Sequence, residues 1–187
     1  MHIEKTNVGD NCSATIDRGA SYVESMTLKG TYHVDCHDSL GTLKWSEDIN
    51  NLVTTVGKNL TMDTVLGNSA AGAIVMGLKG TGTALVSDTQ ASHTWLEVGL
   101  ANAPTYSGTR KTPAFSAAVA GAKTVSSAVV FSMTGAGTVA GCFINIGGSA
   151  TIDNTTGVLF SAGDFTAGSK TVTSGDTLSI TYTATSA

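Results

Sequence analysis

Apolar and polar residues alternate along much of the chain, and this pattern predicts β-strands. Near the start, the apolar residues occupy even positions: Leu28, Tyr32, Val34 and Cys36. Segment 177–185 alternates in the same way between apolar residues and threonine or serine. A period of two is that of a strand with one buried face. Turn residues at 38–41 and a return strand at 42–46 make the first segment a predicted hairpin.

One segment departs from this period and predicts a helix. Its apolar residues recur at spacings of three and four: Leu52, Val53, Val56, Leu60 and Leu66. We expect a helix at about 51–66, capped by Asn50 or Asn51 and ended by Gly67. Gly57 inside it costs up to ~1 kcal/mol relative to alanine, so this helix depends on packing against a sheet.

Beyond Ala73 the chain consists of short apolar segments separated by glycine, asparagine, aspartate or serine. The candidate strands are 73–79, 93–98, 106–111, 115–119, 125–134, 138–146, 157–161, 170–173 and 177–185. Their close spacing is typical of an antiparallel sandwich or barrel. The predicted fold class is mainly β, with a single jelly-roll-like β-sandwich domain at 26–187 and one short helix.

Residues 1–25 show little periodicity and predict an irregular, extended N-terminal arm. Its isolated apolar residues are the candidates for contact with neighbouring subunits: Ile3, Val8, Ile16, Tyr22 and Val23. An arm of this kind would gain order and buried area on assembly.

The composition excludes several classes of protein. Threonine, alanine, glycine and serine number 29, 22, 22 and 19, which is 92 of 187 residues. A hydrophobic content of 41% argues against disorder, and ten Lys and Arg against fourteen Asp and Glu argue against direct nucleic-acid binding. Only six of the twenty-four charged residues lie at or beyond position 111, so we expect this neutral half to face copies or partners.

The cysteines, the uncharged stretches and the first residues indicate the cellular compartment in which the protein is made. Cys12, Cys36 and Cys142 are an odd number without CxxC spacing, which argues against a disulfide framework and a thiolate zinc site. Glycines interrupt the uncharged run 124–152, so we expect no membrane span. The first residues lack the apolar core of a signal peptide, and synthesis in a cytoplasm without export is expected.

The densest polar cluster is the segment 33–38. On a strand, His33, Asp35 and His37 project from one face, and two histidines with a carboxylate can hold zinc or iron. A structural zinc site usually needs a fourth ligand, so the favoured interpretation is the solvent face of a hairpin. Cys36 alternates onto the core face, where it serves as a small buried hydrophobe. We therefore expect neither a metal site nor a cofactor.

Other chemical signals are weaker still. The Gly80-Thr81-Gly82-Thr83 fragment resembles part of a phosphate loop, but no lysine-bearing helix follows it. No GxSxG elbow assembles a catalytic triad, and no spacing selects a pair of acids. Four aromatic residues suit either a sugar platform or the core, which is the commoner place for them in strands: Trp45, Trp95, Tyr106 and Phe115. We expect that the protein is not an enzyme.

Several phrases of the sequence occur together in one order. They are 37–38 (His-Asp), 41–45 (Gly-Thr-Leu-Lys-Trp), 51–59 (Asn-Leu-Val-Thr-Thr-Val-Gly-Lys-Asn), 91–97 (Ala-Ser-His-Thr-Trp-Leu-Glu), 102–107 (Asn-Ala-Pro-Thr-Tyr-Ser) and 174–178 (Ser-Gly-Asp-Thr-Leu). From about Thr31 to the C-terminus the chain resembles a family of tailed-bacteriophage proteins of virion-structural or unassigned role. The resemblance implies a particle protein and carries no catalytic residue.

Within a virion, two roles fit this sequence. The first is a capsid decoration or cement protein on the capsid surface, which binds the major capsid protein and copies of itself, as a trimer. It would be made in the host cytoplasm and would stabilise the head through many weak contacts repeated by symmetry. The alternative is a tail- or fibre-associated host-attachment or carbohydrate-binding β-sandwich module.

Overall fold

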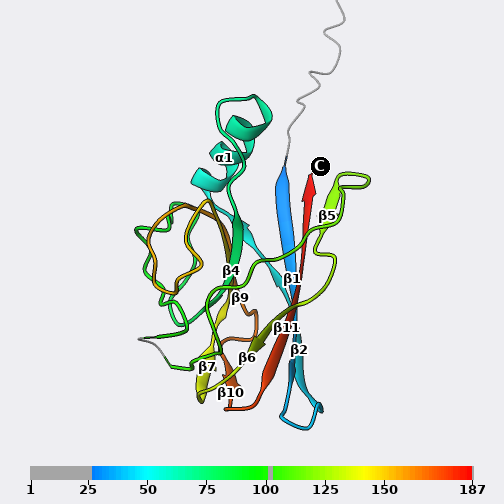
Figure 1. Ribbon diagram of the computed structural model, residues 1–187, viewed down its shortest axis with the longest axis vertical. Helices are drawn as coiled ribbons and strands as arrows, with labels where there is room; N and C mark the ends of the chain where they lie inside the picture. Colours follow the sequence, from blue (N-terminus) through cyan, green and yellow to red (C-terminus); the bar gives the residue numbers. More distant parts are fainter. Residues whose placement is uncertain (1–26, 101–102, 187) are drawn as a thin grey trace, which may run out of the picture.

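The computed structural model describes residues 27–100 and 103–186, and it is mainly β (Figure 1). The strands of the first sheet are β1 (Leu28–His37), β2 (Leu43–Asn50), β5 (Ala122–Thr124), β6 (Val129–Ser132) and β11 (Thr177–Ser186). Their order is β2-β1-β11-β5, and β6 also pairs with β11. The strands of the second sheet are β3 (Leu52–Val53), β4 (Ile74–Lys79), β8 (Gly141–Ile146) and β9 (Val158–Asp164), in the order β3-β9-β8-β4. A short ribbon joins β7 (Gly137–Val139) to β10 (Lys170–Val172).

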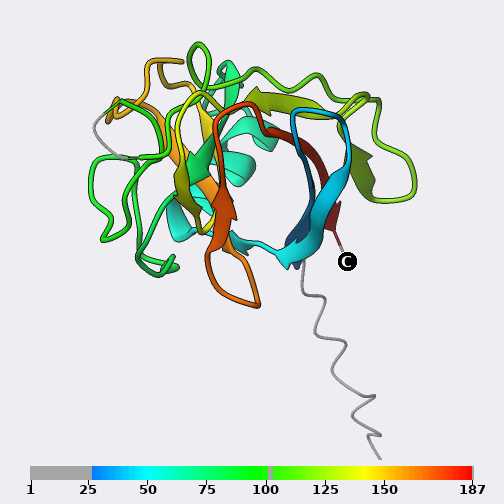
Figure 2. The same ribbon diagram turned by 90° about the horizontal axis from the view of Figure 1, so that it is seen from below.

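The two sheets face each other across one main core, as the view from below shows (Figure 2). All strand pairings are antiparallel, which gives a sandwich-like arrangement and confirms the predicted fold class. The finer jelly-roll topology stays a prediction. Part of this core is made by alternate residues of the two long central strands: Tyr32, Val34 and Cys36 on β1, and Leu178, Ile180 and Tyr182 on β11.

The second sheet is buried on both faces. On β8, Cys142 and Ile144 belong to the main core, whereas Phe143 points the other way, into a second apolar cluster. That cluster also contains Trp95 from the long connection between β4 and β5, and Leu159 from β9. The outer face of this sheet is therefore covered by chain, not by solvent.

The helix α1 spans Thr55–Val65, so the predicted start at Asn50 or Asn51 is wrong. Leu52 and Val53 instead form β3, paired with β9. Thr54 caps the helix, because its side-chain oxygen accepts a hydrogen bond from the backbone N–H of Gly57. Gly57 is buried against β9, and a Cβ there would overlap the carbonyl oxygen of Phe160. The glycine thus allows close contact between helix and sheet.

Most strand predictions are confirmed, but three segments are wrong. Segments 93–98, 106–111 and 115–119 are loops that contact strands through single bridges. The bridges pair Glu97 with Lys79, Lys111 with Met76, Tyr106 with Met133, Phe115 with Val125, and Val119 with Ala122. Segments 93–98 and 106–111 run beside a sheet for one or two residues only, so they do not form strands. The predicted strand at 138–146 is also divided, at Ala140, into β7 and β8.

Several predictions concern residues outside this description. The arm at 1–25, with Ile3, Val8, Ile16, Tyr22 and Val23, lies outside the described residues, as does Cys12. Cys36 and Cys142 are free and buried, which confirms the core position predicted for Cys36. Within the described ranges, no helix is long and apolar enough to cross a membrane.

Candidate functional site

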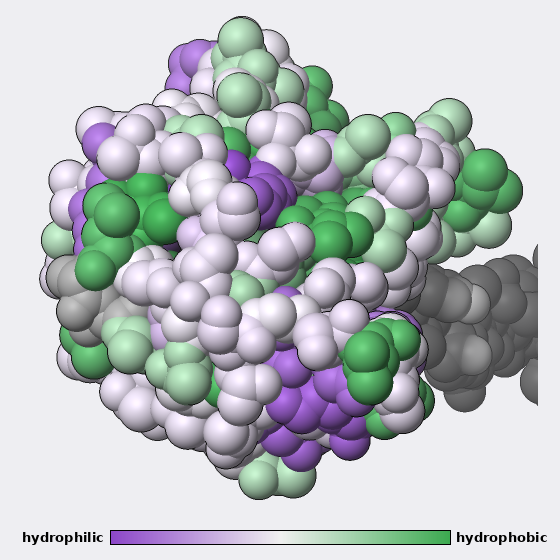
Figure 3. Space-filling model, turned by 60° about the horizontal axis from the view of Figure 1, so that its bottom comes forward, coloured by the Kyte–Doolittle hydropathy of each residue, from purple (hydrophilic) through white to green (hydrophobic). Residues whose placement is uncertain are grey.

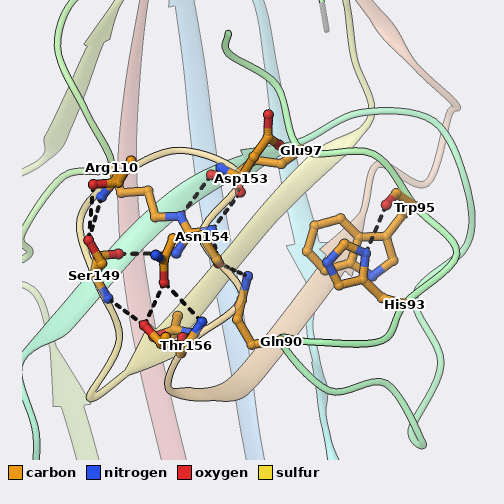
Figure 4. A network of polar contacts seen from close by, with 11 residues as sticks. Gln90, His93, Trp95, Glu97, Arg110, Ser149, Asp153, Asn154 and Thr156 are labelled. Atoms are coloured by element: carbon orange, nitrogen blue, oxygen red, sulfur yellow. Dashed lines mark hydrogen bonds and ion pairs between the residues drawn. The ribbon is translucent and has the colours of Figure 1, made fainter. Parts of the chain in front are cut away.

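A network of polar side chains, in which Gln90, Glu97 and Arg110 are buried, lies on the outer side of the second sheet (Figure 4). At its centre, Arg110 and Glu97 form a buried two-pronged ion pair. Arg110 Nε lies 2.8 Å from Glu97 Oε1, and Arg110 Nη2 lies 2.6 Å from Glu97 Oε2. This parallel geometry makes strong, directional hydrogen bonds.

The edge of β4 brings the two charges together. Glu97 bridges Lys79 at the end of β4, while Lys111, next to Arg110, bridges Met76 on the same strand. The guanidinium carbon of Arg110 lies 5.3 Å from the ring centre of Phe143 on the neighbouring strand β8. A cation is attracted to the face of an aromatic ring, so the second apolar cluster also supports the ion pair.

Arg110 and Glu97 also hold the connection between β8 and β9. Arg110 donates hydrogen bonds to the carbonyl oxygens of Ser149 (3.1 Å) and Asn154 (2.8 Å). Asp153 adopts a left-handed conformation (φ 59°), and its backbone N–H donates to Glu97 Oε2 at 3.0 Å. The network therefore ties two long connections to each other and to the sheet.

A polar hollow of about 170 Å³ opens beside this network. It is lined by Gln90, Ala91, His93, Glu97, Asp153, Asn154 and Thr155. Gln90 is buried and donates from Nε2 to the carbonyl oxygen of Asn154 at 3.2 Å, while its Oε1 has no hydrogen-bond partner among the described residues. His93 Nδ1 lies 2.8 Å from the carbonyl oxygen of Trp95, so this nitrogen carries a proton.

In the hollow, the buried ion pair has a structural role, and the polar groups around it remain able to form hydrogen bonds. Both carboxylate oxygens of Glu97 accept hydrogen bonds from Arg110, and one of them also accepts from the backbone of Asp153. A carboxylate held in this way serves as an ion-pair partner and is poorly placed as a general base. Glu97 and Arg110 therefore position loops, and the surrounding amide, imidazole and carboxylate groups can offer hydrogen bonds to a small polar molecule.

A second buried cation lies nearby, at the end of β4. The ammonium group of Lys79 is buried, forms an ion pair with Asp164 and donates to the carbonyl oxygens of Gly80 and Gly82. It also lies 5.8 Å from the ring centre of Trp95. The fragment 80–83, which resembles part of a phosphate loop, thus directs two carbonyl oxygens toward a lysine of its own chain.

The predicted polar face of β1 is arranged around His33. Its Nδ1 lies 2.7 Å from Asp48 Oδ1, and its Nε2 lies 3.3 Å from Asp35 Oδ2. The hydrogen bond with Asp48 raises the pKa of His33, and hydrogen bonds from Ser46 and then His33 lower the pKa of Asp35. Among the described residues, no three His, Cys, Asp or Glu side chains gather as metal ligands around His33, Asp35, His37 or elsewhere.

The four aromatic residues considered for a sugar platform contact the interior. Trp95 and Tyr106 are buried, whereas Trp45 and Phe115 are partly buried and packed against the main core. The Trp45 ring meets Phe165 edge-on, with ring centres 5.5 Å apart. The interpretation as core is therefore confirmed for Trp95 and Tyr106, while Trp45 and Phe115 lie at the margin of the core.

The sequence pattern alone does not predict the buried ion pairs. Arg110 is the only arginine after Arg18, and it begins the nearly neutral half of the chain, which is the one signal that could have drawn attention to it.

Comparison of the chain with protein-family models, curated proteins and solved structures found no match.

Proposed function

We propose that the protein is a structural component of a tailed-bacteriophage virion, and within it a capsid decoration or cement protein. It would bind the shell of major capsid protein, together with copies of itself as a trimer, and stabilise the head. The ordered phrases from Thr31 to the C-terminus support the phage assignment. A compact mainly β domain with an additional N-terminal segment suits a subunit that covers joints between other subunits.

The observation that carries this proposal is the hairpin between β1 and β2. Leu40 is 90% exposed and Leu43 is 54% exposed. Hydrogen bonds fix the turn, because Asp38 Oδ1 accepts from the backbone N–H groups of Leu40 (2.9 Å) and Thr42 (2.8 Å). An ordered turn that presents two leucines to solvent is better suited to a protein partner than to water.

The opposite end of the molecule also exposes apolar side chains. Val65 and Leu66, at the end of α1, are 74% and 75% exposed. Figure 1 places α1 and the β1–β2 hairpin at opposite ends of the long axis. When the hairpin end comes forward, small hydrophobic patches stand on a mostly pale, weakly polar surface (Figure 3).

The mechanism would be mechanical. Burying one leucine contributes roughly 1.5–3 kcal/mol, so contacts at two ends of each copy give modest binding that symmetry multiplies over a shell. Four basic side chains are already engaged within the domain: Lys44 with Asp176, Lys79 with Asp164, Arg110 with Glu97 and Lys170 with Glu47. These four cations are therefore neutralised within the domain and need no acidic partner.

Electron microscopy of labelled virions tests the proposal. We expect antibodies against this protein to label the surface of the head, or its density to appear there in a high-resolution reconstruction. Density confined to the tail would contradict the decoration role, and absence of the protein from purified virions would contradict a virion role altogether.

One observation favours a second candidate, the host-attachment or carbohydrate-binding module. The polar hollow beside Glu97 presents the amide of Gln90, the imidazole of His93 and the carboxylate of Asp153 together. Such groups are common in sugar sites, although the tryptophans face inward. Titration with monosaccharides, followed by NMR shifts of residues 88–97, distinguishes the two: saturable shifts support the module and unchanged spectra oppose it.

A further inference from the structure

The sandwich is open at the end where β1 begins, and there the space between the sheets forms an apolar groove. Two hollows of about 110 and 190 Å³ lie side by side and share Ile74 and Ile146 as a common wall. Phe160, Tyr182 and Ala184 line the first, and Leu60 and Val65 of α1 line the second. We call these joined hollows the apical groove.

The groove exists because the first sheet carries small residues at this end. Gly30 of β1 pairs with Ala184 of β11, and neither has a side chain long enough to reach the opposite sheet. A Cβ at position 30 would overlap the ring of Tyr182, so the glycine cannot be replaced by a larger residue without moving that ring. The apolar wall formed by Ile74 and Ile146 thus faces Tyr182 and the short side chain of Ala184, and unfilled space remains between them.

The chain before β1 reaches the domain at this same end. Leu28 pairs with Ser186, two residues beyond the Gly30–Ala184 pair that borders the apical groove. Tyr22 and Val23 are the last large apolar residues before Met26. Leu28 lies five positions after Val23, a stretch of chain that spans up to ~17 Å, while two packed sheets lie ~10 Å apart. The segment is therefore long enough to reach the apical groove.

We propose that Tyr22 and Val23 dock into the apical groove of their own chain. Their apolar side chains match a wall that is almost entirely apolar, and the short tether favours the same chain over another copy. This inference concerns the isolated protein and does not depend on the virion role.

Thermal unfolding of the full chain tests the docking. We expect the double variant Tyr22→Ser/Val23→Ser to lower the melting temperature by about 5 °C and to raise the fluorescence of a dye that binds exposed apolar surface. The matched control Ile3→Ser/Val8→Ser, with the same loss of apolar side chains, should stay within about 1 °C of the parent. Equal melting temperatures for all three proteins would overturn the inference.

Disulfide trapping tests the location and the chain, and it works even if the first variant fails to fold. In a Cys12→Ser background, Val23→Cys/Ala184→Cys should form an intramolecular disulfide in the monomer under mild oxidation. The control Val8→Cys/Ala184→Cys should not. Disulfide-linked dimers would assign the apical groove to the arm of a second copy, and the absence of any cross-link would place Val23 elsewhere; either result overturns the inference.

Discussion

On β1, every second residue from Gly30 to Cys36 is buried, whereas on β8 residues 141–145 are all buried. The first pattern belongs to a sheet with one face in solvent, where His33 and Asp35 lie opposite threonine and serine of β11. The second pattern belongs to a sheet whose outer face is covered by the long connections that contain Trp95 and Arg110. The comparison shows that one chain supports its two sheets by different means.

The covered face explains why Lys79, Glu97 and Arg110 are buried. Long connections that pack against a sheet bring backbone carbonyl groups out of water, and each needs a hydrogen-bond donor. Arg110 and Lys79 supply these donors to carbonyl oxygens of Ser149, Asn154, Gly80 and Gly82, and Glu97 and Asp164 balance their charges. The open face of the first sheet needs no such device, since threonine and serine meet water there.

Among the changes considered, we expect loss of Arg110 to destabilise the covered second sheet most. Arg110→Ala leaves Glu97 buried without its cation, and we expect it to lower the free energy of unfolding by about 3–5 kcal/mol. The paired replacement Glu97→Leu/Arg110→Met removes both charges and should be less destabilising than the single change. Urea denaturation measures both, and a loss below about 1 kcal/mol for Arg110→Ala would contradict the role of the ion pair.

Two outward-facing residues on central strands give a matched comparison of the sheets. Phe143→Ala, on the covered face of β8, should cost about 3 kcal/mol or more, because it opens a cavity beside Trp95. Thr181→Ala, on the open face of β11, should change stability by less than about 0.5 kcal/mol. Similar costs from urea denaturation would mean that the two outer faces are equally covered.

The stability contributed by the contact between β2 and β10 should depend on pH. A hydrogen bond from Lys170, followed by one from Thr166, lowers the pKa of Glu47 to about 2. A carboxylate whose pKa is lowered by folding stabilises the protein above its unfolded pKa of about 4.3, and this stability is lost as the pH falls toward 2. At pH 7 we expect Glu47→Gln to be about 1 kcal/mol less stable than the parent.

The expected difference between Glu47→Gln and the parent shrinks between pH 4.5 and pH 2. Urea midpoints of both proteins at pH 7, 4.5, 3 and 2 check this convergence. A constant difference across that range would show that Glu47 is not the titrating group.

The exposed hairpin should have the smallest effect on stability. Leu40→Ser/Leu43→Ser removes no core contact, so we expect a change within about 0.5 kcal/mol. Binding to empty heads should nevertheless weaken at least about tenfold, because two leucines lose their burial on the partner. Leu96→Ser, whose side chain is half exposed, is the matched control and should bind like the parent.

The regular parts of the fold could be predicted because alternation reports a half-buried strand directly. β1 and β11 follow from this pattern, as does β2 after its turn. The start of α1 could not be placed, since Leu52 and Val53 fit a helix and a strand equally well until their pairing with β9 is known. Segment 93–98 looked like a strand because His93, Trp95 and Glu97 alternate for a different reason, as they pack against a sheet from a loop.

Most of the candidate site could not be predicted from the sequence. Glu97 and Arg110 are thirteen residues apart, and no local spacing separates a buried charge pair from two solvated charges. The face of His33, Asp35 and His37 could be placed because it follows from strand periodicity alone. Asp48 was not foreseen as the partner of His33, because the register between β1 and β2 decides that contact.

We propose that the outer side of the second sheet supports the fold, while the hairpin end meets the partner. Hydroxyl-radical footprinting of the free protein and of the protein bound to empty phage heads tests this claim most directly, because it reports the exposure of individual side chains. We predict that oxidation of Leu40 and Leu43 falls on binding, whereas oxidation of Leu96 and His93 is unchanged. Protection of Leu96 and His93 with no change at Leu40 and Leu43 would contradict the account.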